Sequence, residues 1–448
     1  MKILHYALGF PPYRTGGLTK YCMDLMVGQK EQGHELALLW PGRISFINNK
    51  LSVLKNRTID GIKSFEIINP LPVALDEGII DIEAYMENCD KKVYRIFLEK
   101  YKPDVIHLHT LMGLHKEFLE ATKELGIKTV FTTHDYYGFC PKVTLFCKGH
   151  TCDDDNGCRN CVECNQHALS MNKIILMQSS LYRKLKGLRV VKALRRRHRR
   201  NFFDDSIVEE TQFSMTETEI EKKAKGYRHL RQYYIDIYSL IDTIHFNSTV
   251  AEKVYMRYFK PKNGKVISIT HSGISDHRKK KEFHGKLKIT YLAPAKPFKG
   301  FYILKAVLDE LWEENHRDFE LNVFSLTDKV SSYINIQDGY QYCELESIFN
   351  RTDILVAPSV WYETFGFTVI EAMSYGVPVL VSENVGAKDI LSEAILVVKR
   401  ESDLKNILKL LIYDRTQLAN MNEILIKNKN NNYMFYSHVE KMVELYRL

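Results

Sequence analysis

Two glutamates, Glu363 and Glu371, stand eight positions apart on either side of the dipeptide Phe365-Gly366. A carboxylate accepts hydrogen bonds at both of its oxygens, so each glutamate suits a polyol such as a ribose or a sugar ring. The free main-chain N–H groups at the start of a helix, together with the helix dipole, favour a phosphate. This short segment therefore offers groups for a ribose, a diphosphate and a sugar, which are the parts of a nucleotide-sugar.

The flanking sequence predicts the elements that position these groups. The apolar runs Ile354 to Ala357 and Val377 to Val381 are typical of buried strands. Between them, Phe367 to Tyr375 is predicted to form a helix that ends at Gly376. Open α/β sheets bind ligands beyond the carboxyl ends of their strands, which is where Gly366 would lie. An ordinary strand–helix–strand unit with solvated glutamates is the alternative interpretation.

The same segment resembles the retaining glycosyltransferases of family 4. The resemblance rests on the two glutamates with Phe365-Gly366, Glu371-Ala-Met and Gly376-Val-Pro in register. In that family the second glutamate holds the ribose of the donor, which implies this role for Glu371. The first glutamate and the amides of the Phe-Gly pair hold the sugar. The resemblance thus implies that Glu363 is catalytic and that Phe365 and Gly366 bind the donor.

A glycine pair near the N-terminus is a second candidate for ligand binding. The predicted strand Ile3 to Leu8 is followed by a loop with two prolines and then by Gly16-Gly17, before a predicted helix. Glycines allow the main chain to approach a ligand closely. The resemblance implies that Gly16 and Gly17 lie against the donor phosphates and the acceptor, and a simple turn is the alternative.

Two predicted strands end at histidines, His109 and His134. A histidine at the end of a strand in a parallel sheet faces the ligand side, so a ligand contact is reasonable for both. The run Thr133-His134-Asp135 resembles the family pattern, which implies that His134 lies near the donor sugar and belongs to the catalytic site. Its role as acid or base stays open, and a hydrogen bond to a loop carbonyl is the alternative for His109.

Two lysines follow the predicted strand Leu287 to Leu292. Family 4 members usually carry an arginine there, followed by Lys-Gly; Lys299-Gly300 fits this pattern, but Pro294 stands at the arginine position. Fixed positive groups stabilise the charge on a departing diphosphate, and removing one such donor costs about 3 kcal/mol. We expect Lys299 to be catalytic and to bind the donor. Either Lys296 supplies a second positive charge, or the site works with a single cation.

No Asp-x-Asp pair suited to a divalent cation follows a strand end in the segments predicted to form the cleft. We therefore expect catalysis to require no cofactor beyond the nucleotide-sugar itself, a UDP- or GDP-sugar. A glycoside hydrolase with paired catalytic carboxylates is the wrong template for such a site.

A cysteine-rich stretch interrupts the pattern. Six of the nine cysteines lie within 25 residues: Cys140, Cys147, Cys152, Cys158, Cys161 and Cys164. In a reducing compartment such a cluster favours a structural zinc site. Cys152, Cys158, Cys161 and Cys164 are the candidate ligands, with His150 or His167 as substitutes. An iron–sulfur cluster and free thiols are the alternatives.

The length and the repeated pattern set the architecture. A chain of 448 residues that is 45% hydrophobic can bury two α/β cores. Strands and helices alternate in both halves, and the resemblance implies an α/β GT-B fold, two facing Rossmann-like domains of doubly wound parallel sheet with a central cleft. We expect an acceptor-side domain at 1–270, with an insert at about 140–235, and a donor-binding domain at 271–432. The C-terminal helix 433–448 is expected to pack back on the first domain.

The charge and one basic run bear on partners and location. The net charge of +8 suits anionic ligands, and no run is long and apolar enough to cross a membrane. We expect a cytoplasmic protein. The run Leu188 to Arg200 has apolar residues at helical intervals, which favours contact with an anionic membrane at the inner face of the cell membrane. A solvated helix is the alternative, and no nucleic-acid partner is expected.

These observations favour a retaining glycosyltransferase of the hexosyltransferase type. The expected acceptor is a saccharide or a polyprenyl-linked saccharide, in the synthesis of a surface polysaccharide or glycolipid. Two alternatives remain. The same fold could serve a nucleotide-sugar epimerase or a phosphorylase, or the chain could be a non-catalytic partner subunit or a zinc-bearing nucleic-acid binder.

Overall fold

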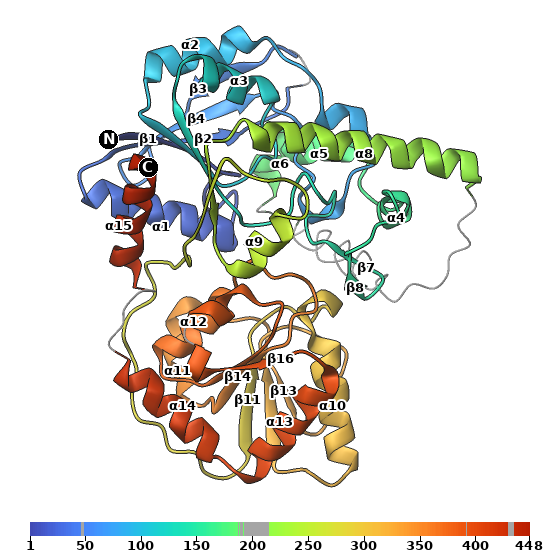
Figure 1. Ribbon diagram of the computed structural model, residues 1–448, viewed down its shortest axis with the longest axis vertical. Helices are drawn as coiled ribbons and strands as arrows, with labels where there is room; N and C mark the ends of the chain where they lie inside the picture. The colour runs from blue at the N-terminus through green and yellow to red at the C-terminus, as the bar shows by residue number, and fades with distance from the viewer. Residues whose placement is uncertain (46–48, 187, 189–190, 192–214, 391, 429–433) are drawn as a thin grey trace.

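The computed structural model describes residues 1–45, 49–186, 188, 191, 215–390, 392–428 and 434–448. These residues form two lobes, each built on an open sheet with helices on its faces (Figure 1). Two predictions fall partly outside the described residues. They are the basic run Leu188 to Arg200, of which only residues 188 and 191 are described, and the first residue of the predicted C-terminal helix, Tyr433.

The first lobe contains an eight-stranded sheet in the order β10-β9-β6-β5-β1-β2-β4-β3. Its strands are β1 (Lys2–Tyr6), β2 (Glu35–Pro41), β3 (Ser52–Lys55), β4 (Lys63–Ile68), β5 (Val105–Leu108), β6 (Lys128–Thr132), β9 (Thr243–Phe246) and β10 (Asn263–Val266). Strands buried on both faces are largely apolar. The strand β5 is buried along its whole length and carries one polar residue, His107.

The predicted parallel sheet is present in this lobe, with one exception at its edge, where β3 pairs antiparallel with β4. The strand β3 lies at the end of the sheet and is half to fully exposed. An antiparallel edge strand on an otherwise parallel sheet is common in such folds. Consecutive antiparallel strands such as β3 and β4 can be joined without a crossover helix. The sequence of β3 carried no signal for its direction.

Helices cover this first sheet. They are α1 (Gly17–Glu31), α2 (Lys91–Tyr101), α3 (Lys116–Glu124), α8 (Glu217–Ser239) and α9 (Thr249–Tyr255). The region between β6 and α8 adds the hairpin strands β7 (Phe146–Cys147) and β8 (His150–Thr151) and the helices α4 (Arg159–Cys164), α5 (Met171–Gln178) and α6 (Ser180–Leu185). The helix α8 begins at a capping box of Thr216 and Glu219.

The second lobe contains a six-stranded parallel sheet in the order β13-β12-β11-β14-β15-β16. Its strands are β11 (Leu287–Tyr291), β12 (Phe319–Val323), β13 (Ile334–Ile336), β14 (Ile354–Ala357), β15 (Val379–Ser382) and β16 (Ile395–Val398). Its helices are α10 (Phe301–Glu313), α11 (Leu345–Asn350), α12 (Phe367–Ser374), α13 (Glu401–Tyr413) and α14 (Thr416–Lys427). The strand order reverses between β11 and β14, and ligands bind at such a switch point.

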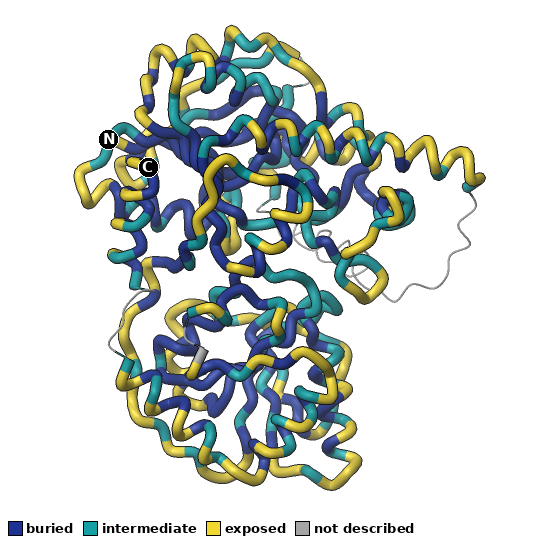
Figure 2. Tube along the Cα trace, in the orientation of Figure 1, coloured by how far each residue is buried: buried dark blue, intermediate teal, exposed yellow. Residues whose placement is uncertain are grey.

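The last helix, α15 (Phe435–Arg447), returns from the second lobe and packs against α1 of the first (Figure 1). The contact is close, because a Cβ atom added at Gly28 would lie 2.8 Å from Val439. The side-chain amide of Gln29 also donates a hydrogen bond to the hydroxyl of Tyr446 at 2.9 Å. Figure 2 shows that the interior of both lobes is buried. None of the described helices has the length and hydropathy needed to span a bilayer.

Candidate active site

The loop between β14 and α12, residues 358–366, carries the first glutamate and is held by main-chain hydrogen bonds on two sides. The N–H of Val360 donates to the carbonyl of Phe298 at 2.9 Å, and the N–H of Glu363 donates to that of Asn384 at 2.9 Å. Gly366 ends the loop with a φ of 100° and immediately precedes α12. A side chain is strained at that φ, so a glycine is needed where the chain enters the helix.

Glu363 forms an ion pair with Lys299 from the loop after β11. The Lys299 Nζ lies 2.7 Å from the Glu363 Oε1, and each side chain is only 16% exposed. The hydroxyl of Ser359 donates to the other carboxylate oxygen. Burial pushes the pKa of Glu363 upward, but the charge and hydrogen bonds of Lys299 and Ser359 outweigh it and hold this pKa below its ordinary value. The carboxylate is therefore ionised at neutral pH.

The loop that carries Lys299 approaches the Glu363 loop so closely that a glycine is required. A Cβ atom added at Gly300 would lie 1.8 Å from the carbonyl oxygen of Pro358, and Gly300 has a φ of 77°. The Nζ of Lys299 lies 4.8 Å from the centre of the Trp361 ring. Lys296 precedes the short helix η3 (Pro297–Lys299), and its Nζ lies 5.5 Å from the Phe298 ring.

Glu371 lies one turn inside α12 and is buried. Its Oε1 lies 3.0 Å from the Nε2 of His271, a buried histidine in the segment that joins the two lobes. Its Oε2 has no partner within hydrogen-bond distance among the described residues, although the Tyr342 hydroxyl lies close enough that burial and Glu371 together raise the pKa of that tyrosine. A buried carboxylate oxygen without a partner is costly, so it marks a position where an external donor group would be stabilised.

The glycine pair of the first lobe lies against α12 of the second. Gly16 precedes α1 with a φ of 112°, and Gly17 is its first residue. A Cβ atom added at Gly17 would lie 3.4 Å from the ring of Phe367, the first residue of α12. Phe365 is buried beside it, with its ring 5.5 Å from that of Phe367. The structure thus brings the N-termini of α1 and α12 together.

His134 follows β6 and lies against the Glu363 loop. The hydroxyl of Thr364 donates to the main-chain carbonyl of His134 at 3.1 Å, and the hydroxyl of Ser248 donates to the carbonyl of Thr364 at 2.6 Å. The Tyr21 ring packs 5.0 Å from the imidazole. Burial lowers the pKa of His134 to about 3, so this imidazole is neutral.

Three groups of this site were missed by the sequence reasoning. His271 and Ser359 bond the two predicted glutamates, but neither lies in a recognisable motif. The third is Asp135, next to His134, and burial raises the pKa of its carboxyl group to about 6. The Thr-His-Asp run was the only signal that could have pointed to it.

The structure does not gather the four predicted zinc ligands into one group. Within the described residues, ligand atoms of Asp155, Cys158 and Cys161 lie within 4.8 Å of one another, and Cys152 and Cys164 are outside this group. Asp155 is also paired with Arg231 of α8.

The cysteine-rich insert contacts the donor-side loops of the second lobe. The hydroxyl of Tyr362 donates to Asp153 at 2.6 Å, and Arg257 donates to the same hydroxyl at 3.1 Å. The Phe146 ring lies 6.1 Å from that of Phe298. The insert therefore touches the loop of Glu363 and the loop of Lys299.

Comparison with known proteins identifies the two halves separately. Residues 15–150 match the family described as Glycosyltransferase Family 4, and residues 274–432 match Glycosyl transferases group 1. No curated protein matches the sequence significantly.

Solved structures resemble the whole chain at low sequence identity. Sucrose-phosphate synthase from Thermosynechococcus elongatus has a TM-score of 0.55 at 14% identity, over 100% of this chain and 98% of that one. HepE from Anabaena in complex with UDP-glucose has a TM-score of 0.55 at 11% identity, over 100% of both chains. WaaG, a glycosyltransferase involved in lipopolysaccharide biosynthesis, has a TM-score of 0.54 at 12% identity, over 99% of both chains. These similarities confirm the predicted GT-B fold.

The ion pair of Lys299 and Glu363 yields a titration prediction. In the variant Lys299→Met the burial of Glu363 is no longer opposed by a cation, so its pKa is expected to rise above the ordinary 4.5. A carbon-13 titration of labelled glutamate side chains measures this pKa directly, and the Glu363→Gln variant assigns the signal.

Because the folded-state pKa of Glu363 is lowered, the ion pair stabilises the folded wild type at pH values above the unfolded-state pKa. The protein loses this contribution as the pH falls through the folded-state pKa.

The matched control for this titration is Lys296→Met in the same loop, since the largest contributions that lower the Glu363 pKa come from Lys299, Ser359 and Trp361. It should leave the pKa of Glu363 below 4.5. An unchanged Glu363 pKa in Lys299→Met would contradict the assigned pairing.

Proposed function

Because this chain belongs to the family 4 glycosyltransferases, we propose that it transfers a sugar from a nucleotide-sugar to a saccharide or lipid-linked saccharide with retention of anomeric configuration. The observation that carries the proposal is the set of groups around the start of α12. It comprises the open Oε2 of Glu371, the ionised Glu363 with its Lys299 partner, and the helix N-terminus at Gly366.

Each part of a nucleotide-sugar finds a matching group in this set. The Oε2 of Glu371 can accept a ribose hydroxyl, while Oε1 stays with His271. The N–H groups at the start of α12 and the ammonium group of Lys299 suit the diphosphate. Lysine has three N–H donors, so Lys299 can serve a phosphate without leaving Glu363. HepE from Anabaena, which shares the fold, was solved with UDP-glucose, and this supports a nucleotide-sugar donor here.

The chemistry follows from the charges. Cleavage of the sugar–phosphate bond leaves negative charge on the nucleotide and positive character on the sugar ring. Lys299 and the start of α12 stabilise the first, and the ionised Glu363 stabilises the second. A carboxylate with a lowered pKa is a poor general acid, so Glu363 binds hydroxyls and stabilises charge rather than donating a proton. Attack by an acceptor hydroxyl on the face that the phosphate leaves would give retention, with the hydroxyl proton passing to the departing phosphate oxygen.

Glu371 provides the direct test of donor binding. In Glu371→Ala the ribose loses a charged hydrogen-bond acceptor, which is expected to weaken donor binding about 10- to 100-fold. Glu371→Gln keeps an acceptor for His271 but replaces Oε2 by an N–H donor, and it should weaken binding to a similar degree. Thermal stabilisation by a panel of UDP- and GDP-sugars first selects the donor, and calorimetric titration then measures its affinity.

The control is Glu401→Ala, which removes an exposed glutamate from α13 of the same lobe and should leave donor affinity unchanged. Nucleotide release that depends on an added acceptor distinguishes transfer from an epimerase or phosphorylase, and the anomeric proton coupling of the product reports retention. Unchanged donor affinity in both Glu371 variants would favour a non-catalytic subunit instead.

We also propose that the acceptor is lipid-linked and that the first lobe contacts an anionic membrane. The helices α5 and α6 leave leucines exposed, Leu176 by 50%, Leu181 by 60% and Leu185 by 40%. The exposed Lys173 and Lys184 lie on the same two helices. Apolar and basic side chains together on surface helices suit the headgroup region of an anionic bilayer.

Vesicle co-sedimentation tests this contact. The triple variant with Leu176, Leu181 and Leu185 changed to serine should lose most of its binding to vesicles that contain phosphatidylserine, because apolar burial is removed. Leu410→Ser, at an exposed leucine of α13, is the matched control and should bind as the wild type does. Equal binding of the triple variant and the wild type would contradict the proposal.

The zinc prediction becomes a proposal with a changed ligand set. Two thiolates and a carboxylate suit zinc, and Asp155, Cys158 and Cys161 form the group that is close enough to share one ion. The positive charge of Arg231 beside Asp155 works against a cation there. Elemental analysis should find zinc in the purified protein and lose it in Cys158→Ser but not in Cys343→Ser, an exposed cysteine of the other lobe. Zinc that persists in Cys158→Ser, or is absent from the wild type, would overturn this assignment.

A further inference from the structure

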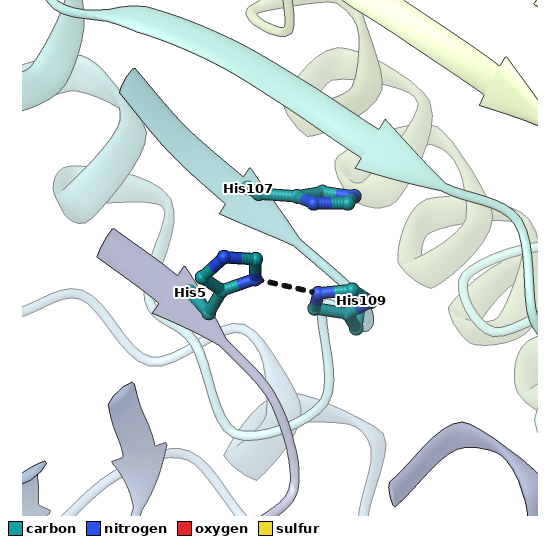
Figure 3. Close-up of side chains that lie close together, drawn as sticks. All are labelled: His5, His107 and His109. Atoms are coloured by element: carbon teal, nitrogen blue, oxygen red, sulfur yellow. Dashed lines mark hydrogen bonds between the residues drawn. The ribbon is translucent and has the colours of Figure 1, made fainter. Parts of the chain in front are cut away.

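Buried histidines gather at the ends of the central strands of the first lobe. His5 lies on β1, His107 lies on β5, and His109 directly follows β5 (Figure 3). All three are fully buried, as is His245 on β9. Buried polar side chains need hydrogen-bond partners, and here the histidines are linked through a continuous set of bonds that reaches His134.

The direction of every bond in this set is fixed from one end. The main-chain carbonyl of Ile267 can only accept, so the Nε2 of His245, 2.7 Å away, must carry the proton. In a neutral ring the Nδ1 of His245 then accepts from the hydroxyl of Thr132 at 2.8 Å. A hydroxyl has one proton, so Thr132 must accept its second bond from the Nε2 of His107 at 2.7 Å.

The hydrogen bonds continue from His107 into the C-terminal helix and α1. The Nδ1 of His107 accepts from the Tyr446 hydroxyl at 2.7 Å, so this hydroxyl must in turn accept from the amide nitrogen of Gln29 at 2.9 Å. This orients the Gln29 side chain with its oxygen toward His5. The Gln29 Oε1 accepts from the Nε2 of His5 at 2.8 Å.

The last two bonds reach the active site. The Nδ1 of His5 accepts from the Nε2 of His109 at 3.0 Å (Figure 3). The Nδ1 of His109 then accepts from the Nε2 of His134 at 3.3 Å. Within the described residues the Nδ1 of His134 has no hydrogen-bond partner, and His134 is partly exposed.

These bond directions require neutral imidazole rings, and burial keeps the rings neutral. Loss of hydration lowers the pKa of His5 and of His245 to about 4 each. The same cause lowers the pKa values of His107 and His109 well below the ordinary 6.5. A second proton on any of these rings would also place two donors against each other within the set.

We propose that this hydrogen-bond chain from Ile267 through Gln29 to His109 locks His134 as the Nε2–H tautomer and makes its Nδ1 a hydrogen-bond acceptor for the bound saccharide. The consequence for specificity rests on the proposed transferase function. Nδ1 of His134 selects a sugar that presents a hydroxyl or N–H group to it, and it disfavours a carboxylate, whose lone pairs would meet another lone pair. Gln29, His5 and His109 are positioning residues that act through His134.

The same histidines could be taken for a metal site, because ring nitrogens of His5, His107 and His109 lie within 4.8 Å of one another. A metal would need lone pairs on these nitrogens. In the hydrogen-bonded set each lone pair already accepts a proton, and each N–H already has an acceptor. The completeness of the set favours the chain over a metal.

Nitrogen-15 NMR of the full-length protein labelled on histidine tests the proposal, since two-bond correlations distinguish a protonated from an unprotonated ring nitrogen. With the His134→Asn variant for assignment, His134 in the wild type should show an unprotonated Nδ1 and a protonated Nε2 at pH 7. In His109→Leu and in the more distant Gln29→Leu, a measurable Nδ1–H population should appear. His109→Gln, which keeps a donor toward His5 and an acceptor toward His134, should restore the wild-type signal.

The control for this experiment is His115→Gln, at a buried histidine of the same lobe that bonds Tyr94 rather than a member of the chain. It should leave the His134 tautomer unchanged. A protonated Nδ1 on His134 in the wild type would overturn the proposal, as would a metal-shifted signal on His5, His107 or His109. A tautomer unaffected by both His109→Leu and Gln29→Leu would do so as well.

Deoxy analogues of the selected nucleotide-sugar test the specificity separately. Removal of the hydroxyl that meets His134 should lower kcat/KM about 10-fold or more in the wild type and His109→Gln, but much less in His109→Leu. If no hydroxyl shows this dependence, the specificity claim fails. If the chain binds no nucleotide-sugar, the proposed function fails, whereas the tautomer result stands on the NMR signal alone.

Discussion

The ion pair between Lys299 and Glu363 is the interaction on which the candidate site depends. Two charges that are mostly removed from water are costly to bury, and removing one partner leaves the other uncompensated. The loops after β11 and β14 are therefore tied together at the switch point of the second sheet, where Gly300 and Pro358 touch. The pair keeps Glu363 ionised and holds a cation next to the N-terminus of α12, where a diphosphate would be bound.

The two lobes meet at this same point. Thr364 bonds the main chain of His134, and Gly17 lies against Phe367, so the first lobe contributes directly to the surroundings of the glutamate pair. The helix α15 adds a second link, because Tyr446 takes part in the hydrogen bonds that reach His134. A helix from the far end of the chain thus takes part in the hydrogen bonds that reach a histidine of the site.

The sequence was sufficient to predict elements that have a strong local pattern. It was a poor guide where contacts between distant residues determine the structure. The strand–helix–strand unit around Glu371 was predicted with its ends within two residues, because apolar runs and Gly376 mark them. The antiparallel direction of β3 was not predictable, since an exposed edge strand has little pattern. His271 could not be predicted as a site residue, because it bonds Glu371, which lies 100 positions away in the sequence. Ser359 could not be predicted either, because its bond to Glu363 depends on the loop geometry.

The cysteine cluster shows the same limit. Spacing could not select the ligands among the six cysteines, and Cys152 and Cys164 were candidates, whereas the fold gathers Asp155 with Cys158 and Cys161. The segment around Cys158 is positioned by its contacts with α8, among them the pair of Arg231 with Asp155 and the bond from Arg228 to Gly157. The two contacts join residues that are 76 and 71 positions apart in the sequence.

A crystal structure with a bound nucleotide-sugar is the most direct test of the central claim, which concerns where the donor lies. The account predicts a phosphate oxygen within hydrogen-bond distance of the Lys299 Nζ, a ribose hydroxyl on the Oε2 of Glu371, and the sugar beside Glu363. A nucleotide-sugar bound elsewhere, with Lys299 and Glu371 both unengaged, would contradict it.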